Sequence, residues 1–106
     1  MKNKKVVYLA GRISGVPDYK EQFEAAARQV EALGFAVLNP AALPPELGND
    51  RAMKICTAMI DQADVVYFLP SWTGSVGAQL EMAYCKYTGK AHTAKLEALE
   101  VLEVVL

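Results

Sequence analysis

Residues 64–89, DVVYFLPSWTGSVGAQLEMAYCKYTG, decide the predicted fold. They begin with an apolar run of strand length, continue through a loop rich in Pro, Gly and Ser, and end in a helical segment before Gly89. A strand that is apolar throughout is typical of a parallel sheet covered on both faces. The stretch therefore predicts a strand, a loop at its carboxyl end, and a returning helix.

Two similar units precede this one. KKVVYLAG at residues 4–11 is followed by a loop and by a segment with helical apolar spacing that stops at Gly34. FAVLNP at residues 35–40 is followed by a proline-marked loop and a second helical segment. Three strand–helix units predict an α/β fold, a flavodoxin-like or Rossmann-like three-layer sandwich. Its small, mostly parallel sheet has helices on both faces.

The starts of the first two helices are predicted from capping residues. Asp18, with Glu21 three residues later, is typical of a capping box. Asn49 or Asp50 is expected to cap the second helix.

Length and composition limit the class of protein. The chain has 106 residues, 53% of them hydrophobic, so residues 1–106 are expected to form one small domain. The formal net charge of −1 and the lack of a basic block argue against a nucleic-acid binder. Its apolar runs are too short for a membrane segment, and Cys56 and Cys85 are expected to be buried thiols, so we expect a cytoplasmic protein. With one histidine and no paired ligand spacing, neither a metal nor a cofactor is expected.

The tail, residues 92–106, allows two predictions. VLEVVL at residues 101–106 suits an edge strand, whereas TAKLEALEVLE at residues 93–103 has helical spacing and suits packing on a partner chain. The small size of the domain and the apolar residues from Leu96 to Leu106 predict a homo-oligomer, most simply a dimer.

Two loops are expected to form a ligand site. In open parallel sheets, ligands bind beyond the carboxyl ends of the strands, where the strand order reverses. The loops 11–16 and 70–75 line one crevice if the first and third strands are neighbours. GRISG at residues 11–15 offers backbone N–H groups, a hydroxyl and Arg12, which suit a phosphate or a sugar hydroxyl. The alternative is that its glycines serve turn geometry and Arg12 is a solvated charge.

Glu81 is the strongest single candidate, because no other charged residue lies between Pro70 and Lys86. Helical side chains lean toward the helix N-terminus, so Glu81 is expected to reach over Gly77 and Ala78, which leave open space. The nearby helix N-terminus favours the ionised form, so we expect a carboxylate at neutral pH. It would serve as a nucleophile or as an acceptor for sugar hydroxyls. The alternative is a solvated glutamate near the helix start.

Aromatic and hydroxyl side chains near the loops are further candidates. Trp72 and Tyr8 are able to stack on a base or a sugar face, although Tyr8 lies within a strand and equally suits a core role. Ser75 offers a hydroxyl to a ligand, or equally caps the third helix.

Three segments together resemble a known family. They are YLAGRISG at residues 8–15, FAVLNPAAL at residues 35–43, and LPSWTGSVGAQLEMA at residues 69–83 with Gly-Lys following at residues 89–90. This layout resembles the nucleoside 2-deoxyribosyltransferase-like superfamily, and within it the small phage and bacterial proteins known as DUF4406. The resemblance covers roughly residues 5 to 90.

The resemblance implies a reaction and a set of roles. In the characterised transferases and the related 2′-deoxynucleoside 5′-monophosphate N-hydrolases, the glutamate of this motif attacks the anomeric carbon of the deoxyribose. It therefore implies that Glu81 is catalytic, that Tyr8 and Gly11 border the sugar, and that the loop 12–15 lies where the hydrolases hold a 5′-phosphate. The candidate substrate-binding residues, from the loops and the resemblance together, are Tyr8, Gly11, Arg12, Ile13, Ser14, Gly15, Trp72, Ser75, Gly77 and Ala78.

Two departures from the family pattern leave a second hypothesis open. Cys56 and Ser75 stand where those enzymes have aspartates. The first hypothesis is cleavage of, or transfer across, the N-glycosidic bond of a nucleoside or nucleotide. The alternative is a non-catalytic module on the same fold that binds a nucleotide or sugar phosphate. A third interpretation is a vestigial crevice on a protein that acts through its oligomer surfaces.

Overall fold

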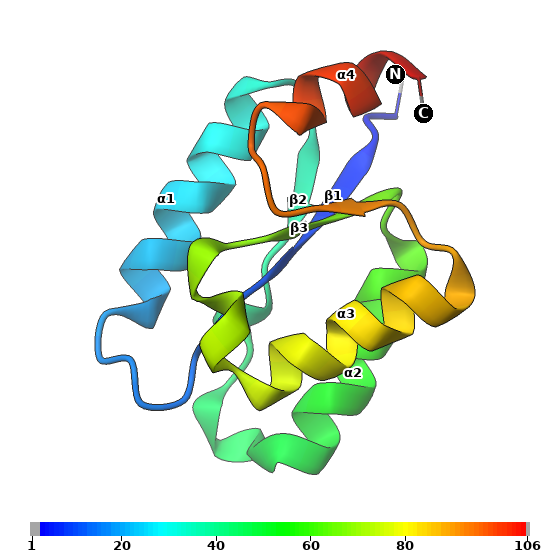
Figure 1. Cartoon of the computed structure of the whole chain (residues 1–106). Coiled ribbons are helices and arrows are strands. Elements are labelled where there is room, and N and C mark those ends of the chain that lie inside the picture. The colour runs from blue at the N-terminus through cyan, green and yellow to red at the C-terminus, as the bar shows by residue number, and fades with distance from the viewer. Residues whose placement is uncertain (1–2, 106) are drawn as a thin grey trace.

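The computed structural model describes residues 3–105, in which strands and helices alternate along the chain (Figure 1). The strands are β1 (Val6–Ala10), β2 (Ala36–Leu38), β3 (Val65–Phe68) and β4 (His92–Thr93). The α-helices are α1 (Tyr19–Ala32), α2 (Gly48–Gln62), α3 (Val76–Thr88) and α4 (Ala98–Val105). Three short 3₁₀ helices lie in the loops: η1 (Pro40–Ala42), η2 (Pro45–Leu47) and η3 (Pro70–Gly74). No helix in this part of the chain has the length and apolar content needed to cross a bilayer.

The four strands form one parallel sheet in the order β2-β1-β3-β4. Tyr8 of β1 pairs with Leu38 of β2 on one side and with Val66 of β3 on the other. The prediction that the first and third strands are neighbours is therefore confirmed. The chain leaves β1 in one direction toward β2 and later returns to its other side, so the strand order reverses at β1.

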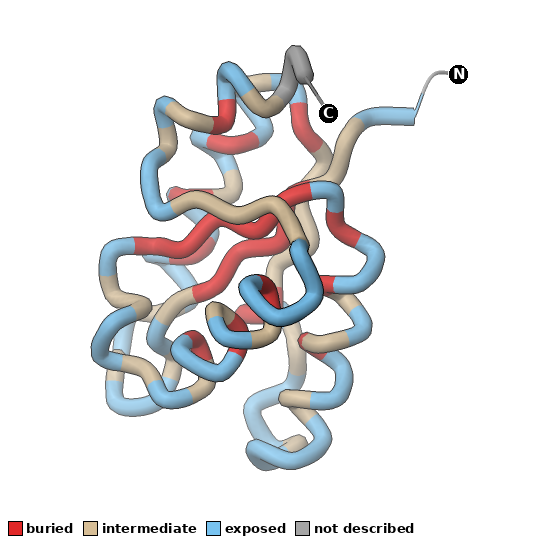
Figure 2. Tube along the Cα trace, turned by 45° about the vertical axis from the view of Figure 1, so that its right-hand side comes forward, coloured by how far each residue is buried: buried red, intermediate tan, exposed pale blue. Residues whose placement is uncertain are grey.

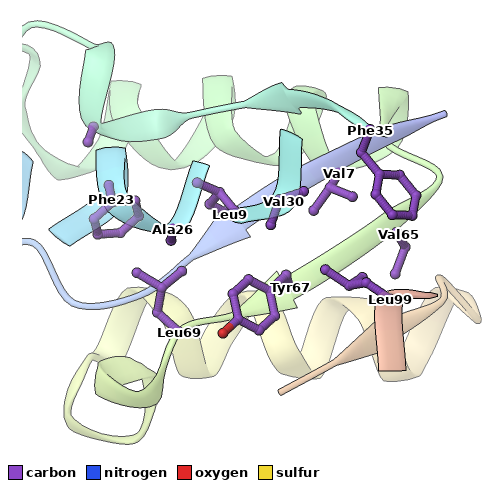
Figure 3. Close-up of a cluster of buried hydrophobic side chains, with 11 residues drawn as sticks. Val7, Leu9, Phe23, Ala26, Val30, Phe35, Val65, Tyr67, Leu69 and Leu99 are labelled. Carbon is purple, nitrogen blue, oxygen red and sulfur yellow. The ribbon is translucent and has the colours of Figure 1, made fainter. Parts of the chain in front are cut away.

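Alternate residues of the central strands face two different helical layers. Val7, Leu9, Val65 and Tyr67 pack against α1 and against Leu99 of α4 (Figure 3). Tyr8, Ala10, Val66 and Phe68 pack against α2 and α3. Figure 2 shows this as buried segments along the strands and on the inner sides of the helices. The predicted three-layer sandwich is confirmed, with one apolar cluster on each face of the sheet.

The first predicted helix start is confirmed but its capping hydrogen bond is not, and the predicted cap of the second helix is wrong. Asp18 occupies the N-cap position of α1, but its side chain accepts a hydrogen bond from the Gln22 side chain (3.0 Å), not from a backbone N–H group. The second helix begins at Gly48, before either predicted cap. Gly48 has a φ of +80°, which lets the chain pass directly from η2 into α2 and leaves no position for a capping side chain.

The predicted bounds of the third helix are confirmed. The Ser75 hydroxyl accepts a hydrogen bond from the backbone N–H of Ala78 (3.1 Å), as an N-cap residue does. The helix ends at Gly89, which adopts the left-handed conformation with a φ of +76°.

The tail begins with β4 and continues into α4, so the edge-strand alternative is wrong for the described residues 101–105; Leu106 lies outside them. Leu99 is fully buried, and Leu96 and Leu102 pack against the same cluster on the α1 face of the sheet. These three leucines contact the chain's own core, so they are not a free apolar surface for a partner.

Candidate functional site

A cleft of about 620 Å³ lies where the strand order reverses, beyond the carboxyl ends of β1 and β3. This is the position at which open parallel sheets bind ligands, and the volume suits a small molecule. The cleft is bounded by the loop after β1, by the end of η3 and by the first turns of α2 and α3. Nine predicted site residues line it: Tyr8, Gly11, Arg12, Ile13, Ser14, Ser75, Gly77, Ala78 and Glu81.

Glu81 is a buried carboxyl group in the wall of this cleft. The residue is only 7% exposed, which excludes the alternative of a solvated surface glutamate. Its Oε2 accepts a hydrogen bond of 2.6 Å from the hydroxyl of Tyr8. Because β1 places Tyr8 on the face of the sheet that α3 covers, strand and helix together fix the carboxyl group. The second carboxyl oxygen, Oε1, is not used in this contact.

The prediction that Glu81 is a carboxylate at neutral pH holds only in part, because its pKa lies close to neutral pH. Burial raises the pKa of Glu81 from 4.5 to about 7, and the hydrogen bond from Tyr8 opposes this rise. The helix begins at Val76, so Glu81 lies more than one turn from the N-terminus, where the helix dipole has little effect. Desolvation therefore outweighs the dipole, and Glu81 exchanges its proton near neutral pH.

Cys56 of α2 completes a cluster with Tyr8 and Glu81. Its thiol interacts with the Tyr8 hydroxyl, and burial raises the pKa of Cys56, so the thiol is neutral. Burial raises the pKa of Tyr8 as well, and both Glu81 and Cys56 add to that rise. Tyr8 therefore stays protonated and donates its hydrogen to Glu81. Cys56 and Cys85 are free and buried, as predicted.

The loop after β1 is fastened to the loop after β3. The backbone N–H of Arg12 donates to the hydroxyl of Ser71 (3.0 Å), and Nε of Arg12 donates to the carbonyl oxygen of Ser14 (3.1 Å). The guanidinium group lies beside Gly74, where an added Cβ would be 3.8 Å from Nη1. These contacts hold Arg12 at the border of the cleft.

The guanidinium of Arg12 has no carboxylate partner within the described residues. The ion pairs found there join Arg28 to Glu24 and Lys54 to Asp50, both on exposed helix surfaces. Arg12 therefore offers unused N–H donors and a positive charge to a ligand in the cleft.

Two predicted site residues do not line the cleft. Trp72 packs edge-on against Phe68, with ring centroids 5.5 Å apart, and so belongs to the apolar cluster of the α2–α3 face. Gly15 lies beside the Arg12 guanidinium and has a φ of +77°, so its role is to form the turn.

The sequence interpretation missed much of the opposite wall. Pro40 and the first turns of α2, with Asn49, Asp50 and Met53, border the cleft. Val76 and Leu80 of α3 were also missed, whereas Gly74 lies in the loop 70–75 that was expected there. A signal for the wall from α2 was present. The second strand pairs with the first, so the loop after FAVLNP opens at the same edge of the sheet as the GRISG loop. Within residues 3–105, no three His, Cys, Asp or Glu side chains are arranged to hold a metal ion.

Residues 5–93 match the family described as Domain of unknown function (DUF4406). The chain belongs to this family. No curated protein gave a match. Among solved structures, the fold is similar to a 2-desoxiribosyltransferase from Leishmania mexicana, with a TM-score of 0.66 and 19% sequence identity. The similarity covers 83% of this chain but 61% of that protein, and at this identity it shows a shared fold.

Proposed function

We propose that this DUF4406 protein cleaves, or transfers across, the N-glycosidic bond of a nucleoside or nucleotide, with Glu81 as the nucleophile. The observation that supports the proposal most is a buried carboxyl group held by Tyr8 in the wall of a cleft of suitable size. The likeness in fold to a deoxyribosyltransferase suggests the reaction class, and the Glu81 carboxyl group supplies the nucleophile which that reaction needs.

In the proposed reaction, Glu81 must lose its proton before it reacts. The free oxygen Oε1 attacks the anomeric carbon, the carbon–nitrogen bond breaks, and the base leaves with the electron pair and takes up a proton. The sugar is then joined to Glu81 as an ester. Attack by water on the anomeric carbon gives the free sugar, whereas attack by a second base gives a new nucleoside. Either attack restores the carboxylate.

Arg12 supports a nucleotide as the substrate. Its unused guanidinium N–H groups and the nearby backbone of residues 13 and 14 suit a phosphate on the sugar. We propose that 5′-monophosphates are preferred to nucleosides. The two free thiols suit a reducing compartment, so we place the reaction in the cytoplasm.

A non-catalytic module that binds nucleotides is the second candidate. The observation that favours it is the neutral thiol of Cys56 beside Tyr8, where a leaving base would need a proton donor. A thiol whose pKa is raised donates a proton less readily than a carboxyl group. Such a module would bind the same ligands without breaking a bond.

A base-release assay separates the two candidates. Deoxynucleosides, ribonucleosides and their 5′-monophosphates are incubated with the protein, and free base is measured by chromatography, with Glu81→Gln in parallel. We expect free base from the wild type and none from Glu81→Gln. Calorimetric titration of the same compounds measures binding. Binding without base release would support the binding module. The absence of both binding and base release would refute both proposals.

A further inference from the structure

A second hollow lies on the α1 face of the sheet, opposite to the face that carries Tyr8 and Glu81. It has a volume of about 450 Å³ and is formed by α1, by the end of β3 and by the start of η3. We call it the Tyr67 depression, and its lining residues are Gln22, Ala25, Ala26, Gln29, Tyr67, Leu69, Pro70 and Ser71. None of these residues lines the cleft, so the two hollows are separate.

The hydroxyl of Tyr67 lacks a hydrogen-bond partner in the described part of the chain. Tyr67 is only 6% exposed, because its ring belongs to the apolar cluster of the α1 face. Figure 3 shows the hydroxyl on the side of Leu69 and away from Phe35. Since no fully buried side-chain oxygen of the described residues is left without a partner, the Tyr67 oxygen is reached from the depression. A buried tyrosine normally bonds its hydroxyl to a partner, so a ligand in the depression would supply one.

Two further side chains add hydrogen-bonding groups to the depression. Ser71 already accepts a hydrogen bond from the backbone N–H of Arg12, so its own hydroxyl hydrogen is left to donate. The exposed amide of Gln29 makes no hydrogen bond within residues 3–105, and it both donates and accepts. The apolar part of the lining consists of Ala25, Ala26, Leu69 and Pro70. The depression thus combines apolar surface with two hydroxyl donors and a free amide.

The charges around the depression disfavour an anion. None of its eight described lining residues is charged, whereas Arg12 lines the cleft. Burial and the nearby Glu97 carboxylate both raise the pKa of Tyr67, so a negative charge lies close to its hydroxyl. A phosphate is therefore attracted by the cleft and repelled here. The ligand that fits is uncharged and offers acceptors to the hydroxyls of Tyr67 and Ser71.

We infer that the Tyr67 depression binds an uncharged nucleobase, either free or as part of a nucleoside. The ring nitrogens and carbonyl oxygens of a base accept hydrogen bonds, and a glutamine amide pairs with the edge of adenine. The volume lies within the range of small-molecule sites, and the apolar lining suits the faces of the ring. The choice of a base among uncharged heterocycles rests on the proposed function, because that reaction releases or consumes a base.

Amide chemical shifts locate the bound base. In ¹H–¹⁵N spectra we expect adenine to shift the backbone signals of Gln29, Tyr67 and Ser71 in the wild type. Adenosine is titrated into Glu81→Gln, in which the proposed nucleophile is absent, and the same shifts there would show that a base attached to a sugar also binds. Shifts confined to the cleft residues Gly77 and Ala78 with both compounds would overturn the inference.

The dependence of affinity on single side chains tests the contacts. Tyr67→Phe removes only the hydroxyl and should weaken the binding of adenine roughly fivefold, the loss expected for one hydrogen bond. Gln29→Ala changes an exposed residue outside the core and should weaken it as well. Tyr84→Phe is the matched control, because its hydroxyl bonds Asp61 outside both hollows, and it should bind as the wild type does.

The outcomes separate this inference from the proposed function. Adenine that binds equally well to the wild type, Tyr67→Phe and Gln29→Ala, or to none of them, would overturn the second site even where base release depends on Glu81. The expected shifts and losses of affinity, without release of base from any substrate, would support the second site while the proposed reaction failed.

Discussion

At the scale of the residue, Glu81 combines two requirements that oppose each other. A nucleophile must be ionised, but the burial that excludes water from the site raises the pKa of Glu81 to about 7. The Tyr8 hydroxyl partly resolves this conflict, because its hydrogen bond to Oε2 favours the ionised form and leaves Oε1 free.

The first prediction concerns the pH dependence of base release. If Glu81 is the nucleophile, kcat/KM rises with pH through the pKa of about 7 and levels off above it, because only the ionised form attacks. Initial rates for the best substrate in a series of buffers of constant ionic strength measure this. Activity that is already maximal near pH 5 would contradict the assigned role.

The second prediction replaces the nearest hydrogen-bond partner. Tyr8→Phe removes the contact that lowers the pKa of Glu81, so the rising limb of the pH profile should move to higher pH. Tyr84→Phe is the matched control, because it removes a hydroxyl that bonds Asp61 outside the cleft. Equal profiles for the two variants would show that Tyr8 does not influence the ionisation of Glu81.

The third prediction concerns stability and needs no substrate. The native state keeps a proton on Glu81 that the unfolded chain releases above about pH 4.5, so stability falls as pH rises from 4.5 to about 7. The shift corresponds to about 3 kcal/mol at most. Glu81→Gln abolishes this loss, so in urea denaturation the free energy of unfolding of the variant should rise relative to that of the wild type between about pH 4.5 and about pH 7. The exposed Glu46→Gln should show no such trend. If the difference in free energy of unfolding between Glu81→Gln and the wild type did not change with pH, burial would not raise the pKa of Glu81.

The sequence pointed to Glu81 as a residue of the cleft but did not predict its burial or the pKa of about 7 that follows from it, for one physical reason. Local spacing predicts that the side chain leans over Gly77 and Ala78, because this follows from helix geometry. Burial depends on β1 and α2, which approach only in the folded chain, and no local pattern reports it. The same reason explains Trp72, whose loop position suggested a ligand contact before Phe68 was known to lie beside it.

At the scale of the element, features that follow from a local sequence pattern were predicted, and features that depend on contacts elsewhere in the chain were not. Long apolar runs identified β1 and β3, and Gly89 identified the end of α3. Asp18 starts α1 as predicted, but its side chain bonds Gln22 and not the helix backbone. The predicted cap of α2 was wrong because Gly48 starts that helix through its own backbone conformation. In a parallel sheet the loop after β2 opens at the same edge as the loop after β1, but that α2 lines the cleft depends on how this helix packs, which no local pattern reports.

The fourth prediction tests the confirmed cap of α3. Ser75→Ala removes the acceptor for the Ala78 N–H group and should lower the free energy of unfolding by about 1 kcal/mol. Ser75→Asp keeps an acceptor at this position and should lose much less. Urea denaturation of both variants measures the difference. Equal losses for the two variants would show that the hydroxyl serves another purpose than capping.

At the scale of the whole molecule, the tail belongs to the domain although the family match ends at residue 93. Helix α4 covers the same face of the sheet as α1, and Leu99 is fully buried there among Val7, Phe35 and Val65 (Figure 3). The neighbouring Val101 is exposed on the same helix. Two apolar residues of one helix therefore differ in their contribution to the fold.

The fifth prediction uses this difference. Leu99→Ala leaves a cavity in the cluster on the α1 face and should lower the free energy of unfolding by about 2–5 kcal/mol. Val101→Ala removes a solvent-exposed side chain and should change it by less than about 0.5 kcal/mol. Urea denaturation monitored by circular dichroism compares the two. If both variants matched the wild type, α4 would be dispensable to the domain. A loss of stability in Leu99→Ala alone would establish that the fold extends beyond the family match, because residue 99 lies after its end.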